Sequence, residues 1–280
     1  MNKFGLCIGI NDYPDTGMRL KGCVNDARDW AAELASRGFE VALLLDAQAT
    51  KAGIVEAVKK VIARGAPEGV VVISFSGHGT YQYDTDGDES DGLDEALCPY
   101  DIKALDTALI DDEIHALFMT RQPGVRLVLI SDSCHSGTVN RDPLGRAARS
   151  DERMPRFMPV ANWMSAARLA RNGPRDTAAA APAQGVATAF ANESPDDDAG
   201  DVLMAGCDEG EGHFSYDASF ADRPNGAFTF HALKALRELR AGASYADWHA
   251  AIARYLPSGR YPQTPQLVGN DQARERQIFG

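Results

Sequence analysis

The sequence predicts an α/β fold with a central, mostly parallel β-sheet flanked by helices. Two observations support this prediction. Short apolar runs rich in β-branched residues recur along the chain, and segments with a helical spacing of apolar residues lie between them. Near-continuous apolar strands are typical of a parallel sheet that is covered on both faces. Their alternation with helices favours a single sheet whose strands are joined by right-handed crossovers.

The strands are expected where the apolar runs lie, beginning with KFGLCIGI at 3–10. The other runs lie at 39–45, 69–75, 125–131 and 201–207. The segments with helical periodicity are 24–38, 51–65, 110–119, 228–240 and 245–256. Gly38 and Gly65 are expected to end the first two helices, because glycine readily adopts the conformation that follows a helix. Asn25 or Asp26 is expected to cap the start of the first helix.

Composition limits the classes of partner. The chain has 280 residues, 44% of them hydrophobic, which is enough to bury a sizeable core. No apolar stretch approaches the roughly 18 residues that a membrane span requires, so no membrane partner is expected. The net charge of −12 disfavours nucleic acid, because phosphate binding needs a basic surface, and it would attract cationic partners instead. The five cysteines are scattered without a C-x-x-C pair, which argues against disulfides or zinc. We therefore expect a cytoplasmic monomer.

Two short polar turns each follow one of the expected strands. They are SFSGHGT at 74–80 and SDSCHSGT at 131–138, and they hold His78 and Cys134. Because the carboxyl ends of adjacent parallel strands meet at one edge of a sheet, we expect these two side chains to come together. An imidazole can draw a nearby thiol toward the thiolate, which is the form that attacks carbonyl groups. The amide of Gly79 would be available to bind an oxyanion.

The residues of these two turns alone leave other interpretations open. A cysteine phosphatase cradles phosphate in a C-x5-R loop, but Arg141 follows Cys134 one position too late. A cysteine-type α/β-hydrolase would need G-x-C-x-G around its nucleophile, and this motif is missing. A catalytically silent interaction module is a further alternative. An ordinary buried role is the expectation for Cys7, Cys98 and Cys207, which lie in or beside apolar runs.

Four motifs in order resemble the catalytic region of metacaspases and their prokaryotic relatives, the orthocaspases. They are SGHGT and DSCHSGT together with GINDYP (9–14) and LKGCVNDARDW (20–30). The resemblance covers 1–137 as a large, p20-like catalytic region. It resumes over 201–280 as a small, p10-like region that completes the same domain. It implies a caspase-like sandwich fold and a cysteine endopeptidase that cleaves proteins or peptides after Arg or Lys.

The resemblance also implies a role for each matching residue. Cys134 would be the nucleophile and His78 its acid–base partner, with the amides of Gly79 and Cys134 as the oxyanion hole. An acidic pocket would bind the basic side chain before the cut, and its residues would be Asp26, Asp132, Cys23 and Ser76. A buried arginine needs carboxylates to pair with, which agrees with this assignment. From residues alone, Asp26 could instead cap a helix and Asp132 could form a turn.

Many members of the family require Ca²⁺, and the resemblance implies Asp94, Asp111 and Asp112 as its ligands here. The position expected for a fourth ligand holds Arg141. The neighbouring loop YDTDGDESDGLDE (83–95) is rich in carboxylates, but an EF-hand would need Gly where Glu89 stands. The alternative is a solvated acidic loop in which Asp111 caps a helix.

The segment 138–200 lacks any strand-like run and is rich in arginine. Its place between the two matching regions implies a linker that the enzyme cuts in itself. The candidate sites are Arg146, Arg149 and Arg153. These residues are far enough from Cys134 to fold back, and they precede the helix-compatible stretch 162–171, whose backbone would resist the extended form that a peptidase groove needs. Alternatively, the arginines only keep this segment soluble.

Overall fold

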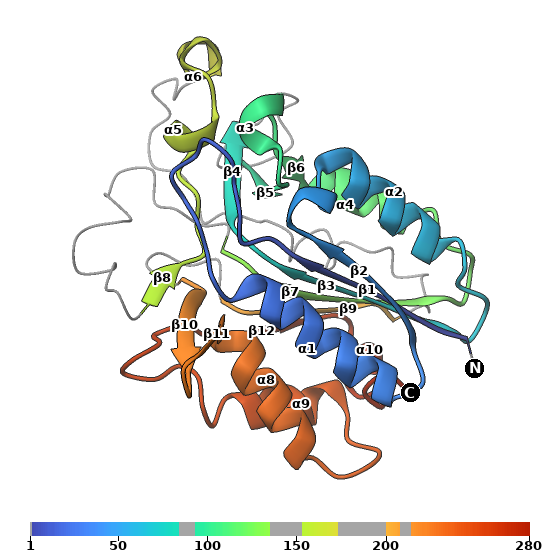
Figure 1. Cartoon of the computed structure of the whole chain (residues 1–280). Helices are drawn as coiled ribbons and strands as arrows, with labels where there is room; N and C mark the ends of the chain where they lie inside the picture. Colours follow the sequence, from blue (N-terminus) through green and yellow to red (C-terminus); the bar gives the residue numbers. More distant parts are fainter. Residues whose placement is uncertain (1, 84–92, 135–152, 173–199, 208–213) are drawn as a thin grey trace.

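The computed structural model describes residues 2–83, 93–134, 153–172, 200–207 and 214–280. Its centre is a six-stranded sheet in the order β12-β9-β7-β3-β1-β2 (Figure 1). The strands are β1 (Lys3–Gly9), β2 (Glu40–Leu45), β3 (Val70–Ser76), β7 (Arg126–Asp132), β9 (Val202–Ala205) and β12 (Gln266–Val268). All neighbouring pairs are parallel except β9 and β12. The predicted α/β class and its mostly parallel sheet are confirmed.

Helices cover both faces of this sheet (Figure 1). One face carries α1 (Cys23–Ser36), α8 (Ala227–Glu238) and α9 (Tyr245–Ile252), and the other carries α2 (Lys51–Ile62) and α4 (Asp111–Phe118). Each of these helices lies where a helix was predicted. Short helical segments complete the set, namely a 3-10 turn (Asp46–Gln48), α3 (Ile102–Leu105), α5 (Val160–Trp163), α6 (Ala166–Asn172) and α10 (Asp271–Arg274). No helix in the described ranges is long and apolar enough to cross a membrane.

The predicted cap of α1 is wrong. Gly22 occupies the N-cap position, and the side-chain oxygen of Asn11 accepts the N–H groups of Cys23 at 2.8 Å and Val24 at 3.3 Å. Asn11 lies two residues after the end of β1, so it satisfies these amide groups from outside the helix. The carboxylate of Asp26 therefore does not cap α1 and contacts the guanidinium of Arg156 instead.

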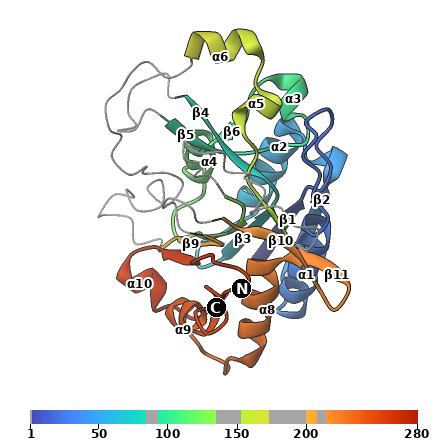
Figure 2. The same cartoon turned by 90° about the vertical axis from the view of Figure 1, so that its left-hand side faces the viewer.

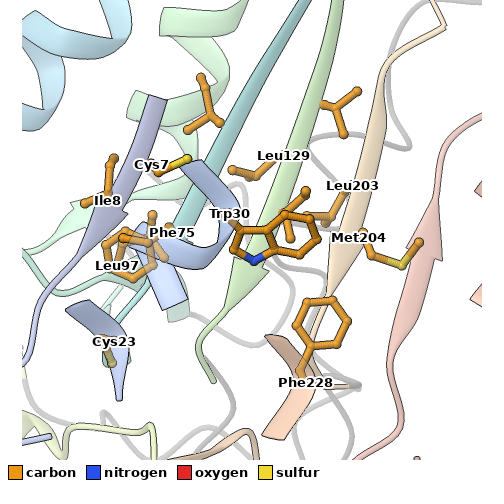
Figure 3. Close-up of a cluster of buried hydrophobic side chains, with 14 of the residues drawn as sticks. Cys7, Ile8, Cys23, Trp30, Phe75, Leu97, Leu129, Leu203, Met204 and Phe228 are labelled. Carbon is orange, nitrogen blue, oxygen red and sulfur yellow. The ribbon is translucent and has the colours of Figure 1, made fainter. Parts of the chain in front are cut away.

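The core lies on both faces of the central strands, under α1 and α8 on one side and under α2 and α4 on the other. Every residue of β3 is buried, and Trp30 of α1 is completely enclosed. Figure 3 shows Trp30 in the cluster that also contains Leu203 and Phe228. Truncating such a side chain typically costs about 3–5 kcal/mol of stability. The edge strand β2 is an exception to the expected burial, because Leu43 remains 43% exposed there.

Two small antiparallel sheets, which the sequence did not predict, flank the carboxyl ends of the central strands. One contains β4 (Gly79–Tyr83), β5 (Leu93–Leu97) and β6 (Leu109–Ile110). The other contains β8 (Arg153–Pro155), β10 (Tyr216–Phe220) and β11 (Arg223–Gly226). The expectation that 138–200 holds no strand is therefore wrong, because β8 lies within it. Helices α5 and α6 follow β8 and lie at the same end of the molecule as β4 (Figure 2).

Candidate active site

The site lies at the carboxyl ends of β3 and β7. These strands are parallel neighbours, with Ser76 opposite Asp132 at their ends. The expected pairing of the two strands is thus confirmed. His78 and Cys134 each follow two residues after the end of a strand, and both are 0% exposed. The two turns therefore begin side by side at one edge of the sheet.

Backbone and phenol groups from the segment after β1 position His78. The imidazole Nε2 of His78 lies 3.1 Å from the carbonyl oxygen of Met18, and the backbone N–H of His78 donates to the hydroxyl of Tyr13 at 2.8 Å. The rings of Tyr13 and His78 are 5.0 Å apart. Because a carbonyl oxygen can only accept, Nε2 carries the proton and Nδ1 is the basic nitrogen. The main-chain carbonyl of Met18 therefore fixes the tautomer of His78.

Cys207 contacts the predicted nucleophile. A hydrogen bond with the side chain of Cys134, together with burial, raises the pKa of Cys207 well above its usual range. The Cys207 thiol also donates to the carbonyl oxygen of Ser133 at 3.5 Å. Cys207 is buried as expected, but it also stays a thiol beside Cys134. No local sequence feature indicated this contact, because Cys207 follows β9 rather than either polar turn.

The two amides predicted to form an oxyanion hole donate to the same atom of the chain. The carbonyl oxygen of Arg156 accepts the N–H of Gly79 at 2.9 Å and the N–H of Cys134 at 3.2 Å. The N–H of Arg156 donates to the carbonyl oxygen of Ser215 at 2.8 Å, and the N–H of Met158 donates to the carbonyl oxygen of Gly79 at 2.8 Å. Residues 156–158 therefore lie across the site, between the segment that precedes β10 and the start of β4.

The side chain of Arg156 fills the acidic pocket and is 0% exposed. Its guanidinium lies 2.6 Å from a carboxylate oxygen of Asp26, 3.1 Å from one of Asp132 and 3.0 Å from one of Asp217. The structure thus brings together the two predicted acids, with Asp217 as a third. Cys23 and Ser76 are both buried, Cys23 close enough to Asp26 and Arg156 to interact electrostatically, and Ser76 beside Asp132 in the sheet.

Separate donors hold the pocket carboxylates in place. Asp132 accepts the backbone N–H of Thr229 at 2.9 Å, the Thr229 hydroxyl at 2.7 Å and the hydroxyl of Ser215. Thr229 lies in the first turn of α8, so the positive end of that helix dipole stabilises the charge of Asp132. Asp26 accepts the N–H of Gly226 at 3.0 Å. Asp217 accepts the backbone N–H of Gly22 at 2.9 Å.

The pKa values in the pocket depend on burial and on the short distances between its carboxylates and the guanidinium of Arg156. Burial raises the pKa of Asp26 to about 6, because the positive charge of Arg156 offsets only part of the desolvation. Burial alone would lower the pKa of Arg156, but the surrounding groups, Asp132 first, raise it well above its usual range. Burial likewise raises the pKa of Cys23 well above its usual range, so that Cys23 stays a thiol. The pocket therefore favours a permanently charged guanidinium.

The predicted calcium ligands lie on neighbouring elements. Asp94 is on β5, and Asp111 and Asp112 open α4, directly after β6. Strands β5 and β6 pair, with Ala96 opposite Ile110, and the chain passes directly from β6 into α4 at Asp111. Even so, the described residues contain no group of three or more side chains that could hold a metal ion. Most of the acidic loop and the expected position of the fourth ligand lie outside the described ranges.

Of the three candidate self-cleavage sites, Arg146 and Arg149 lie outside the described residues. Arg153 is the first residue of β8; it donates to the carbonyl oxygen of Arg260, and its guanidinium lies over the ring of Tyr216, 5.1 Å from the ring centroid. Arg156, three residues further on, is the arginine that lies in the pocket. Nothing in the local sequence distinguishes Arg156 from the other arginines of this segment.

Comparisons with known proteins identify the family of the chain. A family model described as "Metacaspase, peptidase C14 domain" matches residues 3–143. Metacaspase-1A of Neurospora crassa is 41% identical over 145 residues, which are 48% of this chain and 32% of that protein. Metacaspase-1 of Botryotinia fuckeliana is 38% identical over 144 residues, 48% of this chain and 34% of that protein. The chain therefore spans about a third of these relatives.

Two further matches extend along nearly the whole chain. Metacaspase-1 of Pyricularia oryzae is 32% identical over 288 residues, covering 94% of this chain and 70% of that protein. A crystal structure of a Geobacter sulfurreducens protein superposes with a TM-score of 0.72 and 29% identity, covering 100% of this chain and 98% of that one. Because the family model matches half of the chain and a metacaspase aligns with almost all of it, the chain belongs to the metacaspase family of caspase-like cysteine peptidases.

Proposed function

We propose that the protein is a cysteine endopeptidase that cleaves peptide bonds after arginine or lysine, and that it processes itself between Arg156 and Phe157. One observation carries the proposal. The carbonyl oxygen of Arg156 accepts the amides of both Gly79 and Cys134, while its guanidinium is held by pocket carboxylates. This is the arrangement that a peptidase needs for the residue before the scissile bond.

The chemistry follows from these contacts. The thiol of Cys134 gives its proton to Nδ1 of His78, and the thiolate attacks the carbonyl carbon of Arg156. The negative charge that develops on the oxygen is stabilised by the amides of Gly79 and Cys134. The C–N bond breaks, and His78 returns the proton to the leaving amine of Phe157. Water then hydrolyses the thioester at Arg156 and regenerates the thiol.

The charge of the pocket explains the proposed specificity. Three buried carboxylates surround one guanidinium, so a neutral side chain would leave these charges without a counter-charge. An acidic side chain would add repulsion to that cost. We expect peptides with Asp before the cut to be essentially inert, because buried unpaired charge is among the most costly arrangements in a protein.

The decisive experiment is to incubate the purified chain and to map its fragments by mass spectrometry. We expect one fragment that ends at Arg156 and a second that begins at Phe157. The Cys134→Ala variant should stay whole, and Arg156→Gln should lose this cut, whereas the matched variant Arg153→Gln should keep it. Cleavage after Arg146, Arg149 or Arg153 instead would refute the assignment of the site. A wild-type chain that stays whole and hydrolyses no peptide would favour a silent interaction module.

Stimulation by calcium belongs to the same proposal, supported by the family resemblance and by the neighbouring elements that carry the three acids, Asp94 on β5 and Asp111 and Asp112 at the start of α4, directly after the β6 strand that pairs with β5. The proposed steps of peptide-bond hydrolysis do not involve Ca²⁺. Millimolar Ca²⁺ should increase the rate of self-cleavage, and Asp111→Asn combined with Asp112→Asn should remove that increase. Equal rates in Ca²⁺ and in excess chelator would show that these carboxylates have another role.

A further inference from the structure

Phe157, the residue that follows Arg156, lies in a cluster of aromatic rings and is 1% exposed. Its ring is stacked on Tyr81 with centroids 6.2 Å apart and an interplanar angle of 22°. On a second side it meets Phe214 at 6.4 Å and 55°. We propose that Tyr81 and Phe214 form a subsite that selects substrates with a large aromatic residue directly after the basic residue at the cut. This inference rests on the proposed function and deepens it.

The backbone around this subsite binds the substrate as an added strand. Residue 157 forms a parallel bridge with Gly79, and the N–H of Met158 donates to the carbonyl oxygen of Gly79 at 2.8 Å. The hydroxyl of Thr80 donates to the carbonyl oxygen of Met158 at 2.7 Å. Strand β4 thus pairs with β5 on one edge and accepts residues 157–158 on the other. Main-chain bonds of this kind tolerate many sequences, so side-chain pockets must provide the selectivity.

The chemistry of the subsite favours a ring over small or charged side chains. Burial raises the pKa of Tyr81 to about 12, so its hydroxyl is neutral at physiological pH. Tyr81 and Phe214 therefore present uncharged rings to Phe157. Alanine would leave a cavity between them, and aspartate would bring a charge into an apolar environment. Aromatic pairs gain stability beyond their buried area, which further favours Phe, Tyr or Trp.

The subsite is separate from the acidic pocket. Tyr81 lies on β4, whereas the carboxylates that hold Arg156 come from α1, β7 and β10. Changes at Tyr81 should therefore alter the preference after the cut and leave the preference for arginine before the cut unchanged. This separation allows the two specificities to be measured independently.

The first test uses the processed wild-type protein and internally quenched peptides. Each peptide carries Arg-Met-Pro-Arg, the sequence of residues 153–156, followed by Phe, Leu, Ala or Asp. We expect kcat/KM with Phe to exceed that with Ala by about tenfold or more, with Asp lowest. Equal values for Phe and Ala would overturn the inference and leave the proposed function intact. Failure to cleave any of these peptides would instead refute the proposed function, and the inference with it.

The second test assigns the preference to the ring of Tyr81. The Phe-to-Ala ratio of kcat/KM should fall to within about threefold in Tyr81→Ala and should persist in Tyr81→Phe, which keeps the ring. Phe4→Ala is the matched control, because Phe4 is a partly buried aromatic at the amino end of β1. The ratio does not depend on the fraction of active protein, so a loss of stability does not affect it. An unchanged ratio in Tyr81→Ala would overturn the assignment.

The chain's own cleavage provides a third measurement that leaves Tyr81 in place. Phe157→Ala should slow self-cleavage by about tenfold, and Phe157→Tyr should restore it to near the wild-type rate. A Phe157→Ala chain that cuts itself as fast as wild type would contradict the selection of an aromatic residue at this position.

Discussion

Arg156 and Asp132 form a fully buried ion pair, with 3.1 Å between a guanidinium nitrogen and a carboxylate oxygen. The same guanidinium nitrogen also donates to the backbone carbonyl of Asp132 at 3.1 Å. In the proposed reaction, Asp132 is part of the pocket that binds the substrate, and it ends a strand of the sheet. Arg156 is part of the substrate segment, because it precedes the bond to be cut. The chain thus holds one of its own arginines in the way it is proposed to hold a substrate.

Asp132→Asn should weaken turnover of arginine peptides by about 2–5 kcal/mol in kcat/KM, because it removes one charge from a buried, hydrogen-bonded pair. The measurement is steady-state kinetics on the processed protein. Glu40→Gln is the matched control, since Glu40 pairs with Arg64 on the exposed surface, and it should leave the kinetics unchanged. A small effect of Asp132→Asn would show that the pocket does not recognise the basic residue through this carboxylate.

Gly226→Ala should block the pocket. A Cβ atom at Gly226 would collide with a carboxylate oxygen of Asp132 and would lie 2.5 Å from a guanidinium nitrogen of Arg156. The backbone there has φ −70° and ψ 139°, which alanine adopts without strain, so the loss should be confined to binding. We expect neither self-cleavage nor turnover of arginine peptides. Gly259→Ala, where the added atom meets nothing within 4 Å, should retain both.

Arg156→Lys should be cut about tenfold more slowly than wild type. Two guanidinium nitrogens of Arg156 divide their contacts among Asp26, Asp132 and Asp217, and a single ammonium group cannot reproduce this fork. The rate of appearance of the fragment that begins at Phe157 is the measurement. Equal rates for the two side chains would indicate that the pocket recognises charge alone.

The raised pKa of Asp26, about 6, predicts a specific pH dependence of stability. Between about pH 4 and pH 6, the folded protein keeps a proton that the unfolded chain has lost, so this group's contribution to the free energy of unfolding falls as pH rises. The shift corresponds to a change on the order of 3 kcal/mol. Urea unfolding of Asp26→Asn against its parent, both with Cys134→Ala to keep the chain whole, should show a smaller penalty at pH 7 than at pH 4. A penalty that grows with pH would contradict the raised pKa.

The two fragments should stay together after the cut at Arg156. Strand β9 from the second fragment pairs with β7 from the first, and β12 extends the same sheet beyond β9. The indole N–H of Trp163 also donates to the hydroxyl of Thr80 at 3.0 Å across the cut. The fragments should co-elute in size-exclusion chromatography and separate only in denaturant. Separation in native buffer would contradict a shared core.

The strands that precede His78 and Cys134 could be predicted because their signals are local. The apolar runs ending near Phe75 and Ser131 predict two buried strands, and the polar turns after them follow directly in sequence. Parallel pairing of neighbouring strands then brings those turns to one edge by geometry alone. The acids Asp26 and Asp132 were found through the resemblance to metacaspases, because a carboxylate that opens a helix or a turn is locally unremarkable.

Other parts of the site could not be predicted, because they depend on contacts between distant segments. Arg156 and Asp26 are separated by 130 positions in the sequence, and Asp217 and Arg156 are separated by 61 positions. Whether an arginine is exposed or buried depends on three carboxylates converging around it, and no local pattern encodes that convergence. Likewise, the strand β8 forms only because β10 provides its partner. The sequence alone determined the five parallel strands of the central sheet and the edge where His78 and Cys134 emerge, since these follow from short-range hydrophobic patterning. Which arginine fills the pocket was decided by the tertiary structure, because only folding gives that buried charge its counter-charges.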